Sequence, residues 1–369
     1  MKKIAAFAMF ILAAALTLVA CSAESNEKSK ENASATKKFS IVATTYPQYD
    51  WLKNILGDRA NAVDLKLLIK NGTDLHSYKS SAQDIAAIAS ADMVVYVGGE
   101  SDEWVEKALS ATPKAGRVQV NLMEALGDRV KEEEVVEGMQ AEEEHEHHLE
   151  HSDPSTGSGT EEHNKVGEPA EPTADEAHED HDHHEHAEEA ENDEHVWLSL
   201  KNAEILVKKI AEAVANVDTA HATEYHMNAA LYVAKISALD AQYQASVDSA
   251  NFKTILFGDR FPFRYLVDDY GIKYFAAFVG CSAESEASFE TVAFLAGKMD
   301  SLALPAIFTI DGSNGKIARA ILDASKKSKD APVLTLNSMQ SVTDAQMQSG
   351  VDYLSIMREN LEVLKKAIK

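Results

Sequence analysis

A stretch of about thirty residues, Thr219 to Ser249, constrains the fold of this chain more than any other segment. It has few helix-breaking residues and is rich in Ala, Leu and Tyr, so it predicts one long helix. A helix of that length spans about 45 Å, which is too long for the interior of one small domain. We therefore expect residues 219–249 to form a rigid strut that links two domains.

On both sides of this strut, short apolar runs alternate with segments whose apolar residues recur at helical spacing. Before it, the strand-like runs are 41–43, 62–69 and 92–99; after it they are 252–259, 272–280, 304–312 and 331–336. Alternation of this kind predicts an α/β fold, because strands joined by helices form mainly parallel sheets with helices on both faces. We expect two such lobes, residues 39–218 and 250–369.

The N-terminal residues indicate export. Lys2 and Lys3 precede an apolar run from Ile4 to Ala20, which is too short for a usual membrane span and is closed by small residues. The last residues of this run, with Cys21, resemble a bacterial lipobox, so residues 1–20 are predicted to be a lipoprotein signal peptide and Cys21 the lipidated residue. Residues 21–38 are polar and aperiodic, as expected of a flexible tether.

An acidic, histidine-rich insert occupies residues 132–193. Between Lys131 and Glu194 the chain has 25 acidic residues against two lysines, so most of the net charge of −25 lies here, and nothing suggests a basic face for nucleic acid. So many like charges and so few apolar residues predict disorder without metal. Neutral imidazoles bind zinc, so we expect several loose accessory sites. The histidines proposed for them are His145, His147, His148, His151, His178, His181, His183, His184 and His186.

Two histidines outside the insert are stronger candidates for a preorganised site. His76 lies in the polar loop "NGTDLHSYKSS" and His195 in "NDEHVWLS", each just before a predicted helix. Together these segments resemble the ligand motifs of the cluster A-I solute-binding lipoproteins of ABC transporters, the ZnuA- and AdcA-like zinc-binding family. The resemblance extends from Phe39 to Lys369. It implies two lobes joined by a long helix, with a metal ion between the lobes and His76 and His195 among its ligands.

The third ligand of that family is usually a histidine, and here the sequence departs from the pattern. The segment "LFGDRFPFRYLVDDYG" places Arg260 at the histidine position, and a guanidinium, which stays protonated, cannot ligate a metal. An acid after a late strand is the usual fourth ligand. The candidates for the open positions, in order, are Asp311, which matches that acid, Asp259, which requires a shift of one residue, and then Cys281 and Glu284 on a loop expected to face the cleft.

The predicted function is extracellular capture of Zn²⁺ and delivery to an ABC permease. The protein would be a monomer without enzymatic activity, lipid-anchored on the extracellular face of the bacterial cytoplasmic membrane. One alternative is a manganese-binding transport lipoprotein or adhesin. Imidazole ligands favour zinc, and manganese prefers harder oxygen ligands. Another is a zinc-dependent hydrolase, but the sequence has neither an HExxH motif nor a serine nucleophile elbow.

Overall fold

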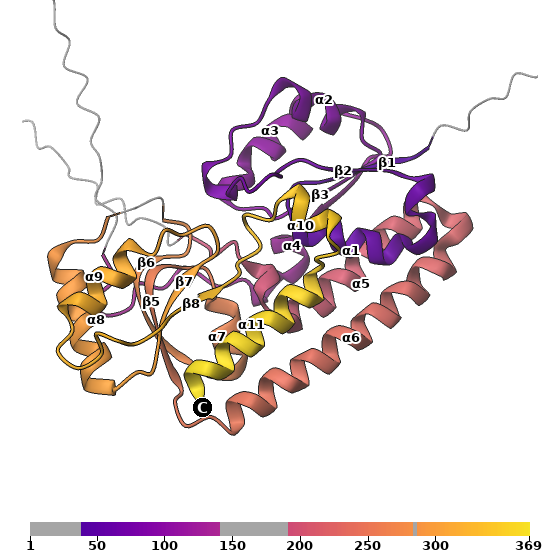
Figure 1. Ribbon diagram of the computed structural model, residues 1–369. Helices are drawn as coiled ribbons and strands as arrows, with labels where there is room; N and C mark the ends of the chain where they lie inside the picture. Colours follow the sequence, from indigo (N-terminus) through magenta and orange to yellow (C-terminus); the bar gives the residue numbers. More distant parts are fainter. Residues whose placement is uncertain (1–37, 141–190, 283–285) are drawn as a thin grey trace, which may run out of the picture. The chain divides into compact units, whose positions relative to one another are not determined.

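Two four-stranded parallel sheets dominate the computed structural model, which describes residues 38–140, 191–282 and 286–369 (Figure 1). The strands of the first sheet lie in the order β2-β1-β3-β4 and those of the second in the equivalent order β6-β5-β7-β8. Two parallel-sheet lobes flanked by helices confirm the predicted fold class. The strands are β1 (Ser40–Ala43), β2 (Asp64–Leu67), β3 (Met93–Tyr96), β4 (Val118–Asn121), β5 (Thr254–Phe261), β6 (Lys273–Val279), β7 (Ile307–Ile310) and β8 (Val333–Leu336).

Helices cover both faces of each sheet. The α-helices are α1 (Tyr46–Leu56), α2 (Ala82–Ser90), α3 (Glu103–Ala111), α4 (Leu122–Leu126), α5 (Leu200–Val217), α6 (Ala222–Asp248), α7 (Arg264–Tyr270), α8 (Phe289–Leu302), α9 (Lys316–Ala324), α10 (Asp344–Gln348) and α11 (Tyr353–Ile368). Short 3₁₀ turns are η1 (Gly57–Ala62), η2 (Leu75–Ser77), η3 (Glu100–Asp102), η4 (Gly127–Arg129), η5 (Val196–Leu198) and η6 (Thr219–His221). None of the helices in the described residues is both long and apolar enough to cross a bilayer.

The outer face of each sheet has its own small core. Successive side chains of a strand point to opposite faces, so Val42 and Val94 pack against α2 and α3, whereas Ile41 and Ala43 face the other way. In the second sheet the corresponding outer core lies against α8 and α9. The inner faces of both sheets share one continuous cluster of buried residues with α1, α5, α6, α7 and α11. The two lobes are therefore joined by packed side chains as well as by the chain itself.

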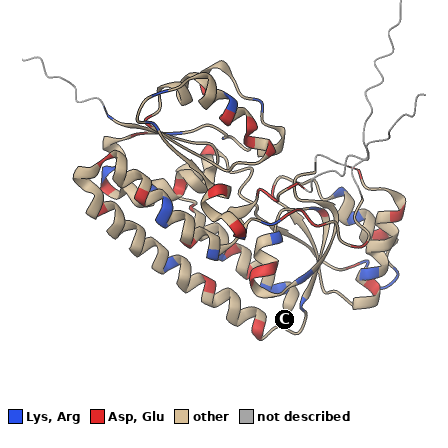
Figure 2. Ribbon diagram, turned by 180° about the vertical axis from the view of Figure 1, so that it is seen from behind, with Lys and Arg blue, Asp and Glu red and all other residues tan. Residues whose placement is uncertain are grey.

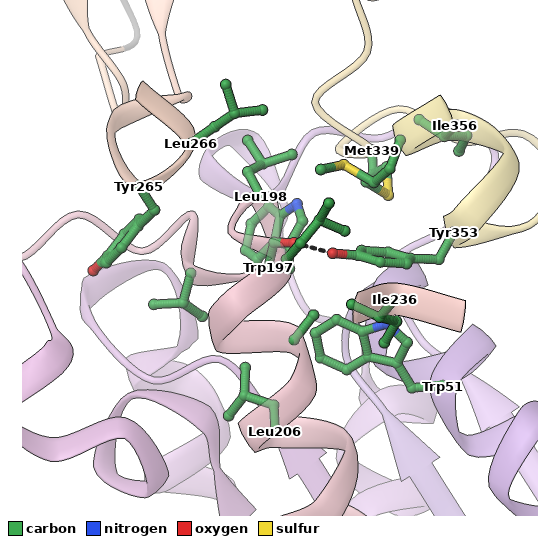
Figure 3. Packing of buried hydrophobic residues seen from close by; sticks show 14 of the residues in the cluster. Trp51, Trp197, Leu198, Leu206, Ile236, Tyr265, Leu266, Met339, Tyr353 and Ile356 are labelled. Carbon is green, nitrogen blue, oxygen red and sulfur yellow. Dashed lines mark hydrogen bonds between the residues drawn. The ribbon is translucent and has the colours of Figure 1, made fainter. Parts of the chain in front are cut away.

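The long helix α6 packs against helices of both lobes within this shared core. Helix α6 has 27 residues, about 40 Å, and contacts α1 and α5 as well as α7 and α11. Beside it, Trp51 and Tyr353 pack edge to face with ring centroids 5.2 Å apart, and the Tyr353 hydroxyl donates to the Trp197 carbonyl over 2.7 Å (Figure 3). Trp197 follows His195 by two residues, so this core fixes the backbone beside a predicted ligand.

The described ends of the acidic insert are ordered, unlike the disorder predicted for residues 132–193. Glu132 forms an antiparallel bridge with Asn192, and the Glu133 amide donates to the Glu191 carbonyl over 2.7 Å. The segment continues along the second lobe, where the Gln140 amide donates to the Ala277 carbonyl over 3.0 Å on β6. Arg264 forms an ion pair with Glu134, and Lys298 forms one with Glu137 over 3.0 Å. These basic residues of the second lobe stabilise a segment whose own charge is negative. The accessory histidines lie outside the described residues.

Candidate metal centre

His76 and His195 approach each other from two loops of the first lobe. His76 lies in η2, after β2, and its amide donates to the Asp74 carboxylate over 3.0 Å. His195 immediately precedes η5 and is fully buried. The two Nε2 atoms are 3.1 Å apart. Two imidazole nitrogens on one tetrahedral zinc ion are about 3.4 Å apart, so a small shift of either ring would admit the ion.

Each imidazole is oriented through its other nitrogen. His195 Nδ1 donates to an Asp193 carboxylate oxygen over 2.9 Å, and His76 Nδ1 lies 2.8 Å from the Ser101 hydroxyl. The Asp193 carboxylate can only accept, so it keeps the proton of His195 on Nδ1 and leaves the Nε2 lone pair free. The Ser101 hydroxyl can donate or accept, and it orients the His76 ring. The buried Gln340 side chain donates to His195 Nε2 over 2.9 Å, which requires the same tautomer.

Cys281 joins the two histidines from the second lobe. It follows β6, and its sulfur lies in a group with one ring nitrogen from each histidine in which all ligand atoms are within 4.8 Å of one another. Among the residues that the structure describes, this is the one group of three His, Cys, Asp or Glu side chains that could hold an ion. The Cys281 amide donates to a Glu133 carboxylate oxygen over 2.9 Å. Imidazole nitrogen and thiolate sulfur are common zinc ligands.

The glycine before Cys281 allows this close approach. A Cβ atom added to Gly280 would lie 3.1 Å from His195 Cε1 and 3.0 Å from the Phe261 carbonyl oxygen. His195 is buried and hydrogen-bonded to Asp193, so the ring has little freedom to yield. A residue without a side chain is therefore needed where the second lobe meets the imidazole.

Buried carboxylates surround the three candidate ligands. Glu194 is 2% exposed, one of its oxygens accepts the Ser101 amide over 2.8 Å, and the other has no hydrogen-bond partner and lies 3.9 Å from His76 Nδ1. Burial raises the pKa of Glu194 and of Glu133. A cation at the centre would offset the cost of burying these negative groups.

The same environment keeps His76 and Cys281 neutral in the absence of metal. Burial, with a smaller contribution from His195, lowers the pKa of His76 to about 3, so its imidazole is neutral at physiological pH. Burial and the nearby Glu133, Asp193 and Glu194 carboxylates raise the pKa of the Cys281 thiol well above its ordinary value. A bound cation reverses this balance, because a coordinating thiol is deprotonated by the metal.

The structure places Asp311 and Asp259 away from the close group of ligand atoms. Both line a cavity of about 300 Å³. Asp311 accepts the Ser338 amide over 2.6 Å and the Ser338 hydroxyl over 2.7 Å. Asp259 accepts the Arg260 amide over 3.0 Å. These bonds hold the two carboxylates within the second lobe. Glu284, the last of the predicted candidates, lies outside the described residues.

Arg260 connects the loops on both sides of the centre. Its guanidinium forms an ion pair with Asp74, two residues before His76, and also donates to the Ser282 carbonyl over 3.5 Å, one residue after Cys281. Burial lowers the pKa of Arg260, and the negative groups nearby partly offset that effect. Arg260 therefore links the loops of His76 and Cys281 through charge and hydrogen bonding.

Sequence reasoning missed three residues that contact the candidate ligands. Asp193 and Glu194 belong to the quoted motif, but Ser101, Glu133 and Gln340 were not selected. The Ser101 side chain contacts His76, which lies 25 positions before it, and the Gln340 side chain contacts His195, which lies 145 positions before it. No local pattern marks a single serine or glutamine as a partner at such a separation, and only the folded chain brings them to the site.

The chain is similar to known proteins along most of its length. The chain matches the ZnuA family, described as zinc-uptake complex component A, periplasmic, over residues 41–367. The zinc-binding lipoprotein AdcA of Streptococcus pneumoniae is 30% identical over 372 aligned residues, which cover 99% of this chain and 61% of that protein. The chain thus spans less than two thirds of the length of that relative.

Two further relatives align with this chain over nearly their full length. The high-affinity zinc uptake system protein ZnuA of Bacillus subtilis is 28% identical, with 98% of this chain and 97% of that protein aligned. The crystal structure of the Zn(II)-bound ZnuA-like domain of Streptococcus pneumoniae AdcA superposes with a TM-score of 0.62 at 25% identity and covers 90% of this chain and 99% of that one. Similarity in both sequence and fold therefore extends across both lobes.

Proposed function

This chain belongs to the ZnuA family of zinc-uptake complex components, and from that premise we propose that it captures Zn²⁺ at the His76–His195 centre and delivers it to an ABC permease. The observation that carries the proposal is the 3.1 Å approach of the two Nε2 atoms, each imidazole being held through Nδ1 by a protein partner. Such a pair is preorganised for a cation before the cation arrives. The protein binds and releases its cargo and catalyses no reaction.

The preference for zinc over manganese follows from the ligand types. Two neutral imidazoles are borderline ligands that suit Zn²⁺, whereas Mn²⁺ favours carboxylate, carbonyl and water oxygens. Asp311 and Asp259, which would have added such oxygens, are hydrogen-bonded within the second lobe. A hydrolase would also need an open coordination position and a general base. Membership in a family of uptake components favours transport.

Anchoring at the extracellular face of the cytoplasmic membrane completes the proposed function. The lipobox-like residues end at Cys21, and the pneumococcal relative is named a lipoprotein. Lipidation at Cys21 would hold the binding lobes near the permease through a tether of polar residues. Replacement of Cys21 by alanine is expected to abolish incorporation of labelled palmitate. Normal labelling and membrane partitioning of that variant would contradict the anchor.

Substitution of the two imidazoles tests the binding site. His76→Ala and His195→Ala each remove one ligand, so we expect zinc affinity at the tightest site to fall at least tenfold, which is about 1.4 kcal/mol. Competition with a chromophoric chelator of high affinity measures that site without interference from weak sites in the insert. His226→Ala, at an exposed position on α6, is the matched control and should leave the affinity unchanged. Unchanged affinity in both ligand variants would place the site elsewhere.

A further inference from the structure

We propose that Cys281 provides a thiolate as the third ligand, which makes the site a His–His–Cys centre for thiophilic ions such as Zn²⁺ and Cd²⁺ and discriminates against Mn²⁺. The inference rests on the proposed function, because it takes His76 and His195 as the other two ligands. It differs from the ligand set that the family resemblance implied, in which a histidine and an acid complete the site.

The geometry brings the sulfur to the imidazoles. All three ligand atoms lie within 4.8 Å of one another. With metal–nitrogen bonds of about 2.1 Å and a metal–sulfur bond of about 2.3 Å, tetrahedral coordination needs nitrogen and sulfur about 3.6 Å apart. The closure required is on the order of 1 Å, within reach of a side-chain rotation. Asp311 and Asp259 would each have to break hydrogen bonds to reach the same point.

The backbone around Cys281 is fixed on both sides. Glu133 accepts the Cys281 amide, Arg260 donates to the carbonyl of Ser282, and Gly280 lies against the His195 ring. A cysteine that merely occupied a loop would need none of these contacts. Arg260 also pairs with Asp74, so the loop of His76 and the loop of Cys281 are tied to one guanidinium. Arg260, which cannot itself bind the metal, thus helps to position Cys281.

The coordination step balances without any further reactant. The S–H bond of Cys281 breaks as the sulfur–metal bond forms, and the proton is released to solvent. The Glu133 carboxylate, which accepts the Cys281 amide, lies beside the residue that loses it. The thiolate then contributes a soft, negatively charged ligand. Soft thiolates favour Zn²⁺ and Cd²⁺, whereas manganese sites are built from oxygen ligands, so replacing an expected carboxylate by a thiolate narrows the range of ions carried.

Cobalt substitution of the full chain provides a direct test. One equivalent of Co²⁺ in reduced protein should produce a thiolate-to-cobalt charge-transfer band in the near ultraviolet. The chain has two cysteines, so Cys21→Ser should keep the band and Cys281→Ser should lose it. Cys281→Ser should also weaken Zn²⁺ and Cd²⁺ binding at least tenfold while changing Mn²⁺ affinity less. Circular dichroism of the variants confirms that each remains folded.

X-ray absorption of the wild-type protein with one equivalent of zinc gives a second measurement that needs no variant. One sulfur at about 2.3 Å from zinc, beside two nitrogens, supports the inference. Tight binding of cobalt and zinc with no charge-transfer band and no sulfur neighbour would overturn it while leaving the proposed function intact. Failure of the proposed function has a different signature, namely zinc affinity that survives both histidine substitutions.

Discussion

Individual side chains at the centre show how a site differs from a chance group of histidines. Both imidazoles carry a hydrogen-bond partner on Nδ1, one a carboxylate and the other the hydroxyl of Ser101. Such a partner orients the ring, and its loss typically weakens metal binding by a factor of 10 to 100. Ser101 belongs to η3, so its position depends on the first sheet and not on the loop that carries His76.

Replacement of Ser101 by alanine is therefore expected to reduce zinc affinity by about tenfold. Ser101→Thr keeps the hydroxyl and should restore most of the affinity. Ser77→Ala, which removes a nearby exposed hydroxyl bonded to the Asp74 carbonyl, is the control. Nitrogen-15 NMR of the zinc-bound protein should report a changed chemical shift of His76 Nδ1 in the alanine variant. An unchanged shift together with unchanged affinity would show that the serine has no positioning role.

The limits of sequence reasoning are also visible at single residues. His76 and His195 lie in short motifs, so they could be selected from the sequence, and the fold brings their rings together. The sequence ranked Asp311 and Asp259 above Cys281, whereas the structure places the sulfur nearer to the imidazoles. Hydrogen bonds from Ser338 to Asp311 decide this, and they depend on the packing of a loop that follows β8. No periodicity in the sequence contains that information.

Among the elements of the described residues, the long helix and seven of the eight strands were predicted from the sequence. The strut predicted for residues 219–249 is a 3₁₀ turn followed by α6, because an uninterrupted run of helix formers leaves few alternatives. Strand β4 was not predicted. It has four residues, one of them the exposed Gln119, and its place in the sheet comes from pairing with β3. Edge strands of this kind depend on their neighbour more than on their own composition.

One buried carboxylate links three of the helices that join the lobes. Asp50 on α1 accepts the Tyr232 hydroxyl of α6 and the Tyr353 amide of α11, each over 3.2 Å. Burial raises the pKa of Asp50 to about 6. The folded state therefore binds its proton more tightly than the unfolded state. The stabilisation from the protonated form is complete below about pH 4 and is lost as the pH rises through about 6.

Replacement of Asp50 by asparagine should consequently stabilise the protein only at higher pH. Each pKa unit corresponds to 1.36 kcal/mol. The gain in unfolding free energy of the variant over the wild type should therefore be up to about 3 kcal/mol larger at pH 7.5 than at pH 4. Denaturant titrations of metal-free protein at the two pH values measure it. Asp58→Asn, at an exposed position in η1, is the control. A difference that does not change with pH would contradict the titration of Asp50 in this range.

For the molecule as a whole, the acidic insert is distinct from the lobes in composition and in place. Residues 141–190 contain 18 acidic residues and one lysine, whereas basic and acidic residues are interspersed over the described helices (Figure 2). The described part of the insert ends at Gln140, beside β6, and resumes at Glu191, whose carbonyl accepts the Glu133 amide. His195 follows only four residues later. The negative charge of the insert is expected to raise the concentration of cations around the protein.

Deletion of the insert separates electrostatic attraction of zinc from zinc binding at the centre. The contacts of the insert's ends determine which residues can be deleted. Residues 132–140 contact the second lobe and should be retained. The linker must join Gln140 to Glu191, which is hydrogen-bonded to Glu133. Gln140 lies seven residues from Glu133, a distance of at most about 25 Å, so a Gly/Ser linker of about ten residues can replace 141–190. We expect titration of this variant to retain one tight zinc site and to lose several weaker ones, because unstructured ligands must be ordered for each ion that they bind.

The same deletion should slow zinc capture at low ionic strength and have little effect at high salt, since the loss of negative charge acts through screened, long-range attraction. Stopped-flow measurements with a fluorescent zinc indicator give the association rate. A variant with the insert present but its histidines replaced by glutamine is the matched control. It should lose the weak sites yet keep the fast, salt-dependent capture, because its carboxylates remain. If instead the deletion variant is folded but has no tight site, the transported ion is bound by the insert and the His76–His195 centre is not the cargo site.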